Sequence, residues 1–144
     1  MGFEDARHQH AFGRTVPAVA ENVAPIRHAV VDLAARSGAD DGVRTDLALA
    51  VGEACANVVV HAYPPGDVGP LVVQATISDS EIVVTVVDQG QGMTPRPDSP
   101  GLGLGLPLIA NLSDRLEIQE GPDGVGTQLE MCFSLRRTAP TTEL

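Results

Sequence analysis

The chain has 144 residues, of which 43% are hydrophobic, and it carries a formal net charge of −10. A domain of this length can bury a proper core without disulfide or metal staples, and this charge argues against sequence-independent nucleic-acid binding, which needs clustered basic residues. All nine basic residues are arginines, so a P-loop and Schiff-base or pyridoxal chemistry, which need a lysine, are excluded.

The N-terminal part of the chain predicts an edge strand followed by a helix. The strand is expected over residues 12–19 and ends or bends at Pro17, because proline cannot donate to a strand ladder. From 20 to 37 apolar residues recur at helical spacing, and Gly38 follows as a stop signal. We expect a single domain over residues 12–136, with flexible ends at 1–11 and 137–144.

A second helix, predicted over residues 43–62, carries polar side chains at four-residue spacing. Glu53, Asn57 and His61 therefore stack on one face of this helix. Asn57 can offer a hard oxygen to Mg²⁺, which takes few protein ligands, and Glu53 can accept a proton from an attacking hydroxyl or water. A solvated helix face explains Glu53 and Asn57 as well, and His61, near the helix end, is expected to be structural.

A hairpin follows, with strands predicted at 71–78 and 81–87. Alternate residues of both strands are apolar, so Asp88 emerges at the end of a buried strand. Its carboxylate is placed to accept a hydrogen bond from an exocyclic amino group such as that of adenine. Gly90 and Gly92 would let a flat base approach the backbone, although an ordinary Asp-x-Gly turn explains Asp88 and Gly90 without a ligand.

Alternating glycines at Gly101, Gly103 and Gly105 precede a short apolar helix predicted over 106–112. The Rossmann fingerprint needs another glycine spacing directly after a strand, so this run does not match it. Pro107 is tolerated in the first turn of such a helix, and free N–H groups at a helix start can hold phosphate. A merely flexible loop is the alternative.

Two more strands are predicted at 115–120 and 127–135, with Thr127 at the start of the second. Thr127 can hydrogen-bond near Asp88 if their strands are neighbours. The strands group around helices without regular alternation, which is typical of an α+β two-layer sandwich with a mixed, mostly antiparallel sheet and helices on one face.

Other features favour a cytoplasmic protein. The sequence has no apolar core of a signal peptide and no run of membrane-spanning length. Cys55 and Cys132 are predicted to be small buried hydrophobes rather than a disulfide, and the cysteines and histidines lack the spacing of zinc ligands.

In order and spacing, four motifs resemble those of the GHKL (Bergerat-fold) ATPases, and more closely those of the bacterial anti-sigma factor serine kinases. The motifs are Glu53-Ala-Cys-Ala-Asn57 with His61-Ala-Tyr63, Asp88-Gln-Gly90-Gln-Gly92, Gly101-Leu-Gly103-Leu-Gly105, and Gly126-Thr127. The resemblance covers nearly the whole chain, from about residue 12 to 135, and it implies the Bergerat fold.

The resemblance implies a role for each motif. Asn57 would coordinate Mg²⁺, Asp88 would contact adenine, and Glu53 would be the general base for phosphate transfer to a serine. The remaining residues that would meet ATP lie in the glycine motifs and at the last strand: Gly90, Gly92, Gly101, Gly103, Gly105 and Thr127. The implied partners are an anti-sigma factor antagonist, which carries the serine, and a sigma factor, with the first strand and helix forming a dimer or sigma-binding surface.

The segment at 93–100 departs from the family pattern. It is short, holds three prolines and offers only Arg96 as a cation where the family carries its ATP lid. Phosphoryl transfer depends on placed positive charge and on a lid that excludes water.

Three functions therefore stay open. The first is an ATP-binding anti-sigma regulator that phosphorylates an antagonist. The second is a partner-binding module of the same fold without phosphotransfer. The third is a nucleotide-independent metal or acid–base enzyme built on Glu53 and His61.

Overall fold

The computed structural model describes residues 9–90 and 102–137 of the chain. In chain order, its elements are β1 (Gln9–Pro17), the 3₁₀ turn η1 (Ala20–Asn22), α2 (Val23–Arg36), α3 (Asp41–Asn57), the π-helical turn η2 (Val58–Ala62), β2 (Pro70–Ile77), β3 (Glu81–Asp88), α4 (Leu102–Leu112), β4 (Arg115–Glu120), the 3₁₀ turn η3 (Pro122–Gly124) and β5 (Thr127–Ser134). Within the described part, no helix has the length and apolar character needed to cross a membrane.

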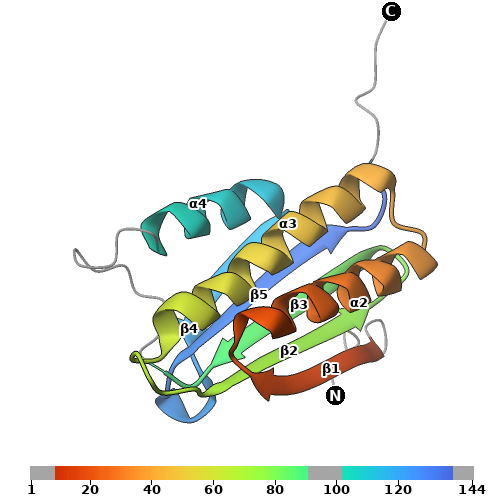
Figure 1. Ribbon diagram of the computed structural model, residues 1–144. Coiled ribbons are helices and arrows are strands. Elements are labelled where there is room, and N and C mark those ends of the chain that lie inside the picture. The colour runs from red at the N-terminus through yellow and green to blue at the C-terminus, as the bar shows by residue number, and fades with distance from the viewer. Residues whose placement is uncertain (1–8, 91–101, 138–144) are drawn as a thin grey trace, which may run out of the picture.

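The strands form one sheet in the order β1-β2-β3-β5-β4, and each neighbouring pair is antiparallel. The helices α2, α3 and α4 lie on one face of this sheet, with α4 beside α3 (Figure 1). The predicted α+β sandwich is confirmed, and the described sheet is antiparallel throughout rather than mixed.

The core lies between the helices and the sheet, and alternate strand residues point into it because successive side chains of a strand face opposite ways. Each fully buried aliphatic side chain contributes about 1.5–3 kcal/mol to stability. The buried residues from the sheet and from α2 and α3 include Leu71, Val73, Ala75, Ile82, Val84, Val86, Leu129, Met131, Phe133, Ile26, Val30, Leu33, Leu47, Val51 and Ala54. The alternation predicted for the three central strands is confirmed.

Two helices differ from their predicted bounds. The helix expected over 43–62 begins at Asp41, and its regular part ends at Asn57, where the backbone widens into η2. Such π-turns are rare in proteins, and those that occur are often found at functional sites. His61 lies in this wide turn, so it does not follow Asn57 by a regular helical turn as the spacing predicted.

The helix expected over 106–112 begins at Leu102, so Pro107 lies inside it rather than in its first turn. Proline lacks the N–H that would bond the carbonyl of Gly103 four residues earlier. Glycine disfavours helix by about 1 kcal/mol per residue, which is why the helix was predicted to begin only after the glycines. Packing against α3 overrides this preference.

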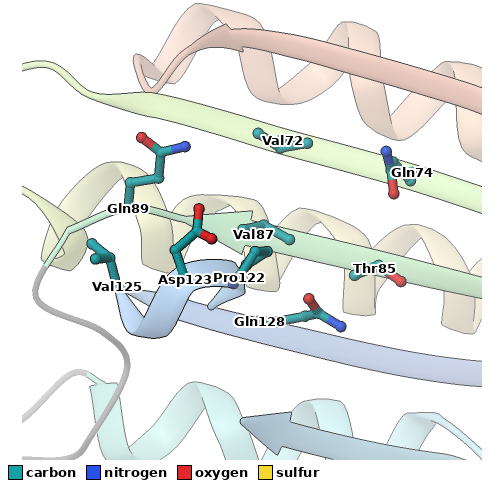
Figure 2. Close-up of a pocket in the computed structure, with 9 residues that line it drawn as sticks. All are labelled: Val72, Gln74, Thr85, Val87, Gln89, Pro122, Asp123, Val125 and Gln128. Atoms are coloured by element: carbon teal, nitrogen blue, oxygen red, sulfur yellow. The ribbon is translucent and has the colours of Figure 1, made fainter. Parts of the chain in front are cut away.

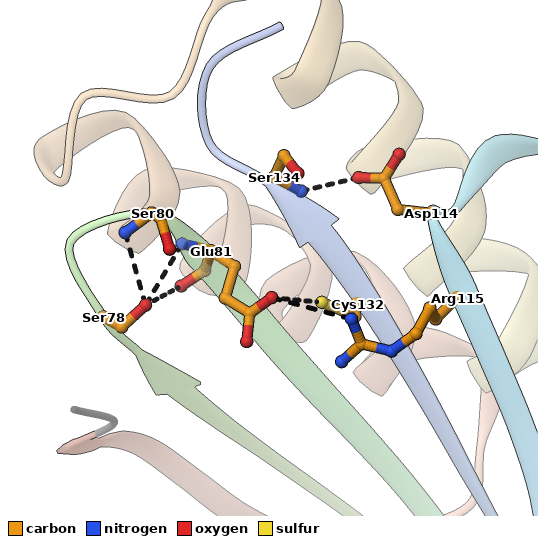
Figure 3. A network of polar contacts seen from close by, with 7 residues as sticks. All are labelled: Ser78, Ser80, Glu81, Asp114, Arg115, Cys132 and Ser134. Atoms are coloured by element: carbon orange, nitrogen blue, oxygen red, sulfur yellow. Dashed lines mark hydrogen bonds and ion pairs between the residues drawn. The ribbon is translucent and has the colours of Figure 1, made fainter. Parts of the chain in front are cut away.

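Polar contacts link the β2–β3 turn to β4 and β5 at one end of the sheet (Figure 3). The Cys132 thiol donates to Glu81 Oε1 at 2.9 Å, and Arg115 lies 3.9 Å from the same oxygen. Burial and this bond to Glu81 raise the pKa of Cys132 to about 12. Burial likewise raises the pKa of Cys55 to about 12. Both cysteines are buried and free, as predicted, and Cys132 also serves as a hydrogen-bond donor.

Candidate functional site

Asp88 lies at the end of β3 and is fully buried. Its Oδ1 accepts a hydrogen bond from the Gly90 N–H at 2.9 Å. Its cross-strand partners are Leu71 in β2 and Thr127 in β5. Asp88 and Thr127 therefore lie opposite each other on adjacent strands. Buried charge is costly unless it is hydrogen-bonded, and the Asp-x-Gly turn provides one such bond.

The glycines next to Asp88 lie where two stretches of backbone come close together. A β-carbon on Gly90 would lie 1.9 Å from the Ala62 carbonyl oxygen, and one on Gly126 would lie 2.0 Å from the Asp88 carbonyl oxygen. Gly126 also has a φ of 71°, which side chains rarely adopt. These glycines are therefore required by the approach of η2 and β5 to the end of β3, independently of any ligand.

Gly105 brings the third motif onto the first. A β-carbon there would lie 2.6 Å from Glu53 Oε2 and 2.7 Å from Asn57 Nδ2. The first half of α4 therefore lies against the polar face of α3, although β2 and β3 separate the two helices in the sequence. A side chain of any size at residue 105 would occupy the space in front of the carboxylate and the amide.

Asn57 is 4% exposed at the end of α3, and Glu53 is half-buried one turn earlier. The Asn57 Nδ2 has no hydrogen-bond partner within residues 9–90 and 102–137. A buried amide donor without an acceptor costs about 1–3 kcal/mol, so its retention suits a ligand rich in oxygen atoms. No described group of three His, Cys, Asp or Glu side chains could hold a metal ion, so a divalent ion at Asn57 would take most of its ligands from elsewhere.

Tyr63, which follows η2, is hydrogen-bonded to the start of β2 and to the residue after β3. No role was predicted for it from the sequence. Its hydroxyl donates to the Pro70 carbonyl at 2.5 Å and accepts from the Gln89 N–H at 2.9 Å. A β-carbon on Gly69 would lie 2.1 Å from Tyr63 Cε1, so the ring fills the space beside that glycine. Burial is the main cause of a raised Tyr63 pKa, and it keeps the hydroxyl protonated. The sequence did contain a clue to this role, because Tyr63 is the one tyrosine of the chain and is the last residue of the first motif.

The structure brings the predicted site residues together in two groups. Glu53, Asn57 and Gly105 form the first group. Asp88, Gly90 and Thr127 form the second. Gly103 lies in the first turn of α4. Three residues predicted to meet the nucleotide lie outside the described residues: Gly92, Arg96 and Gly101.

Comparison with known proteins finds similarity over most of the chain. The model of the histidine kinase-like ATPase domain matches residues 16–133. The chain is 36% identical over 138 residues to the serine-protein kinase RsbW of Halalkalibacterium halodurans, with 85% of this chain and 82% of that protein covered. It is 30% identical over 128 residues to the anti-sigma F factor of Pasteuria penetrans, with 81% and 85% covered.

The fold is also similar to a solved structure of the RsbU and RsbW domains of a Mycobacterium tuberculosis protein, with a TM-score of 0.68 and 25% identity. That match covers 89% of this chain and 32% of the other. The chain therefore spans about a third of that longer protein. The family model extends over the elements that hold Asn57, Asp88 and Thr127.

Proposed function

This chain belongs to the histidine kinase-like ATPase domain family, and from this premise we propose that it is an ATP-binding anti-sigma factor that phosphorylates a serine of an antagonist protein. Relatives that carry the names serine-protein kinase and anti-sigma F factor support this proposal over most of their length. The implied partners are a sigma factor, which the chain would hold inactive, and the antagonist, which would accept the phosphate.

The observation that carries the proposal is the position of Gly105 directly in front of Glu53 and Asn57. It places the N-terminal half of a helix beside a carboxylate and a buried amide. Helix N-termini favour anions through their free N–H groups and the helix dipole. An amide oxygen is a ligand that Mg²⁺ accepts, and Mg²⁺ in nucleotide sites takes few protein ligands and several phosphate oxygens and waters. The donor set therefore fits the triphosphate of a nucleotide with its magnesium ion.

Asp88 would hold the other end of the nucleotide. Its buried carboxylate accepts from a backbone N–H and can accept a further bond from the amino group of adenine. Guanine offers a carbonyl oxygen at the equivalent position of its ring, which a carboxylate repels. Thr127, buried on the neighbouring strand, would support the base beside Asp88.

Glu53 would act as the general base. When bound, ATP supplies the phosphoryl group, and the half-buried Glu53 carboxylate lies at the polar face of α3 that Gly105 faces. It would accept the proton of the attacking serine hydroxyl, a role that needs a carboxylate within hydrogen-bond reach of that hydroxyl. Asn57 would orient the phosphates and Mg²⁺ rather than exchange protons.

The test is transfer of labelled phosphate from Mg-ATP to a serine of the antagonist, with wild-type chain and the Glu53→Gln variant. We expect label on serine with the wild-type chain, and at least about a hundredfold slower transfer with unchanged ATP affinity in the variant. Equal transfer rates in the two proteins would remove Glu53 as the base. ATP binding without any transfer would show a partner-binding module in place of a kinase.

A further inference from the structure

The face of the sheet that the helices leave uncovered holds a cavity of about 410 Å³. Its floor is made by side chains of β2, β3 and β5, and the η3 turn between β4 and β5 closes one end (Figure 2). Asp88 is not part of it, because it faces the helices, whereas its neighbours Val87 and Gln89 point into the cavity. The cavity therefore lies on the other side of the sheet from the nucleotide site.

The lining of the cavity combines an apolar floor with hydrogen-bond acceptors. Val72 and Val87 lie on adjacent strands at its floor, and Val125 stands at the rim, 49% exposed. Figure 2 shows the Asp123 carboxylate and the Gln89 amide at one end. No residue that lines the cavity is basic. Its chemistry thus suits a group that has an apolar stem and a cationic, hydrogen-bond-donating end.

A second observation points to the same class of ligand. Glu117 in β4 and Glu130 in β5 are direct cross-strand partners on this uncovered face, and Glu130 is also the partner of the cavity residue Thr85. Like charges directly opposite each other destabilise a sheet. No ion pair joins either glutamate to an arginine within the described part of the chain. This pair is relieved if a cation of another molecule lies beside it.

We propose that the uncovered sheet face binds a basic segment of a partner protein, with one arginine side chain in the cavity beside Asp123 and a second basic side chain near Glu117 and Glu130. The aliphatic stem of the arginine would cover Val72 and Val87. Its planar guanidinium, with several N–H donors, can meet a carboxylate and an amide oxygen at once, which the single ammonium of lysine does less well. A nucleic acid is disfavoured because its phosphates would face these carboxylates.

The proposed site connects to the nucleotide site through adjacent residues. Gln89 lines the cavity, and its N–H is held by the Tyr63 hydroxyl, while Asp88 faces the opposite side of the sheet. The arginine site does not depend on bound nucleotide, so it goes beyond the function proposed above. Failure of ATP binding would leave it unaffected.

The test uses the full ¹⁵N-labelled chain and the peptide acetyl-Gly-Arg-Val-Arg-Gly-amide, with the same peptide carrying citrulline in place of arginine as control. Citrulline keeps the shape of the side chain and removes its charge. We expect shifts in the side-chain amide signals of Gln74, Gln89 and Gln128 with the arginine peptide, weakened by added salt, and about tenfold weaker binding of the citrulline peptide.

Two variants separate the cavity from general charge attraction. Asp123→Asn removes the carboxylate, and asparagine tolerates the φ of 69° at this position; it should weaken arginine-peptide binding about fivefold. Asp79→Asn removes an equal charge from the exposed β2–β3 turn and should leave binding unchanged. Glu130→Gln should also weaken binding and, in the free protein, raise stability.

Three results would overturn the proposal. The first is equal binding of the arginine and citrulline peptides, and the second is an equal effect of Asp79→Asn and Asp123→Asn. The third is a change in the sedimentation-derived mass of the protein alone on Asp123→Asn, which would make a second copy of this chain the occupant.

Discussion

Gly105 of α4 lies so close to Asn57 of α3 that a β-carbon on the glycine would come within 2.7 Å of the amide nitrogen. This contact joins two motifs that are far apart in the sequence and defines the phosphate end of the proposed site. It also makes a sharp test possible, because a single methyl group there would collide with the carboxylate and the amide that the proposed site uses.

Gly105→Ala should therefore weaken Mg-ATP binding by at least about tenfold, and overpacking should lower the free energy of unfolding by about 1–3 kcal/mol. Calorimetric titration and urea unfolding measure the two effects. Gly42→Ala is the matched control, since its β-carbon would meet only Arg137 Nη1 at 3.4 Å. Unchanged ATP affinity in a folded Gly105→Ala protein would show that the phosphates lie elsewhere.

Asn57→Ala should abolish the magnesium dependence of nucleotide binding. The amide oxygen is the expected Mg²⁺ ligand, and no charge is lost that could change binding through general electrostatics. Removing the buried amide, whose nitrogen has no partner within the described part of the chain, should cost the fold little stability. Titration of ATP with Mg²⁺ and with EDTA measures this, and an equal gain from Mg²⁺ in variant and wild type would exclude Asn57 from the metal site.

Asp88→Asn should weaken ATP by at least about tenfold, or ~1.4 kcal/mol, and should not weaken GTP. The asparagine oxygen can keep the bond from the Gly90 N–H, so the turn is preserved. Its NH₂ group, however, would face the amino group of adenine as donor against donor. Competition titrations with the two nucleotides provide the comparison, and an equal loss for both would mean that Asp88 does not recognise the base.

Tyr63→Phe should lower the free energy of unfolding by about 1–3 kcal/mol, since it removes one donated and one accepted hydrogen bond and leaves the Gln89 N–H without its acceptor. The pKa of Tyr63 is raised above its ordinary value of 10.0 in the fold. Its contribution is therefore fully present below pH 10 and is lost as the pH rises through the folded-state pKa. Urea unfolding of both proteins across the alkaline range measures this. A stability difference that grows above pH 10 would contradict the assignment.

Much of the fold was predictable from side-chain periodicity. The apolar alternation of β2, β3 and β5 and the helical spacing in α2 and α3 follow from which residues can be buried against the opposite layer. A position of Thr127 near Asp88 was expected only on the condition that their strands are neighbours, and β3 and β5 meet that condition.

Other features depend on contacts that no local pattern contains. The early start of α4 follows from glycines that allow it to approach α3, whereas glycine alone favours a loop. The wide turn η2 depends on how the chain leaves α3 toward β2, and periodicity cannot detect one extra residue in a turn. The bonds of Tyr63 to Pro70 and Gln89 join three segments that only the folded sheet brings together.

The proposed ATP site extends from Gly105 to Asp88, and calorimetric titration of the purified chain with Mg-ATP and Mg-GTP is its most decisive test. We expect saturable binding of one Mg-ATP per chain and at least about tenfold weaker binding of Mg-GTP, because a carboxylate accepts from the amino group of adenine. No heat of binding at millimolar Mg-ATP would exclude an ATP site in this chain, and equal affinity for the two nucleotides would exclude recognition of adenine by Asp88.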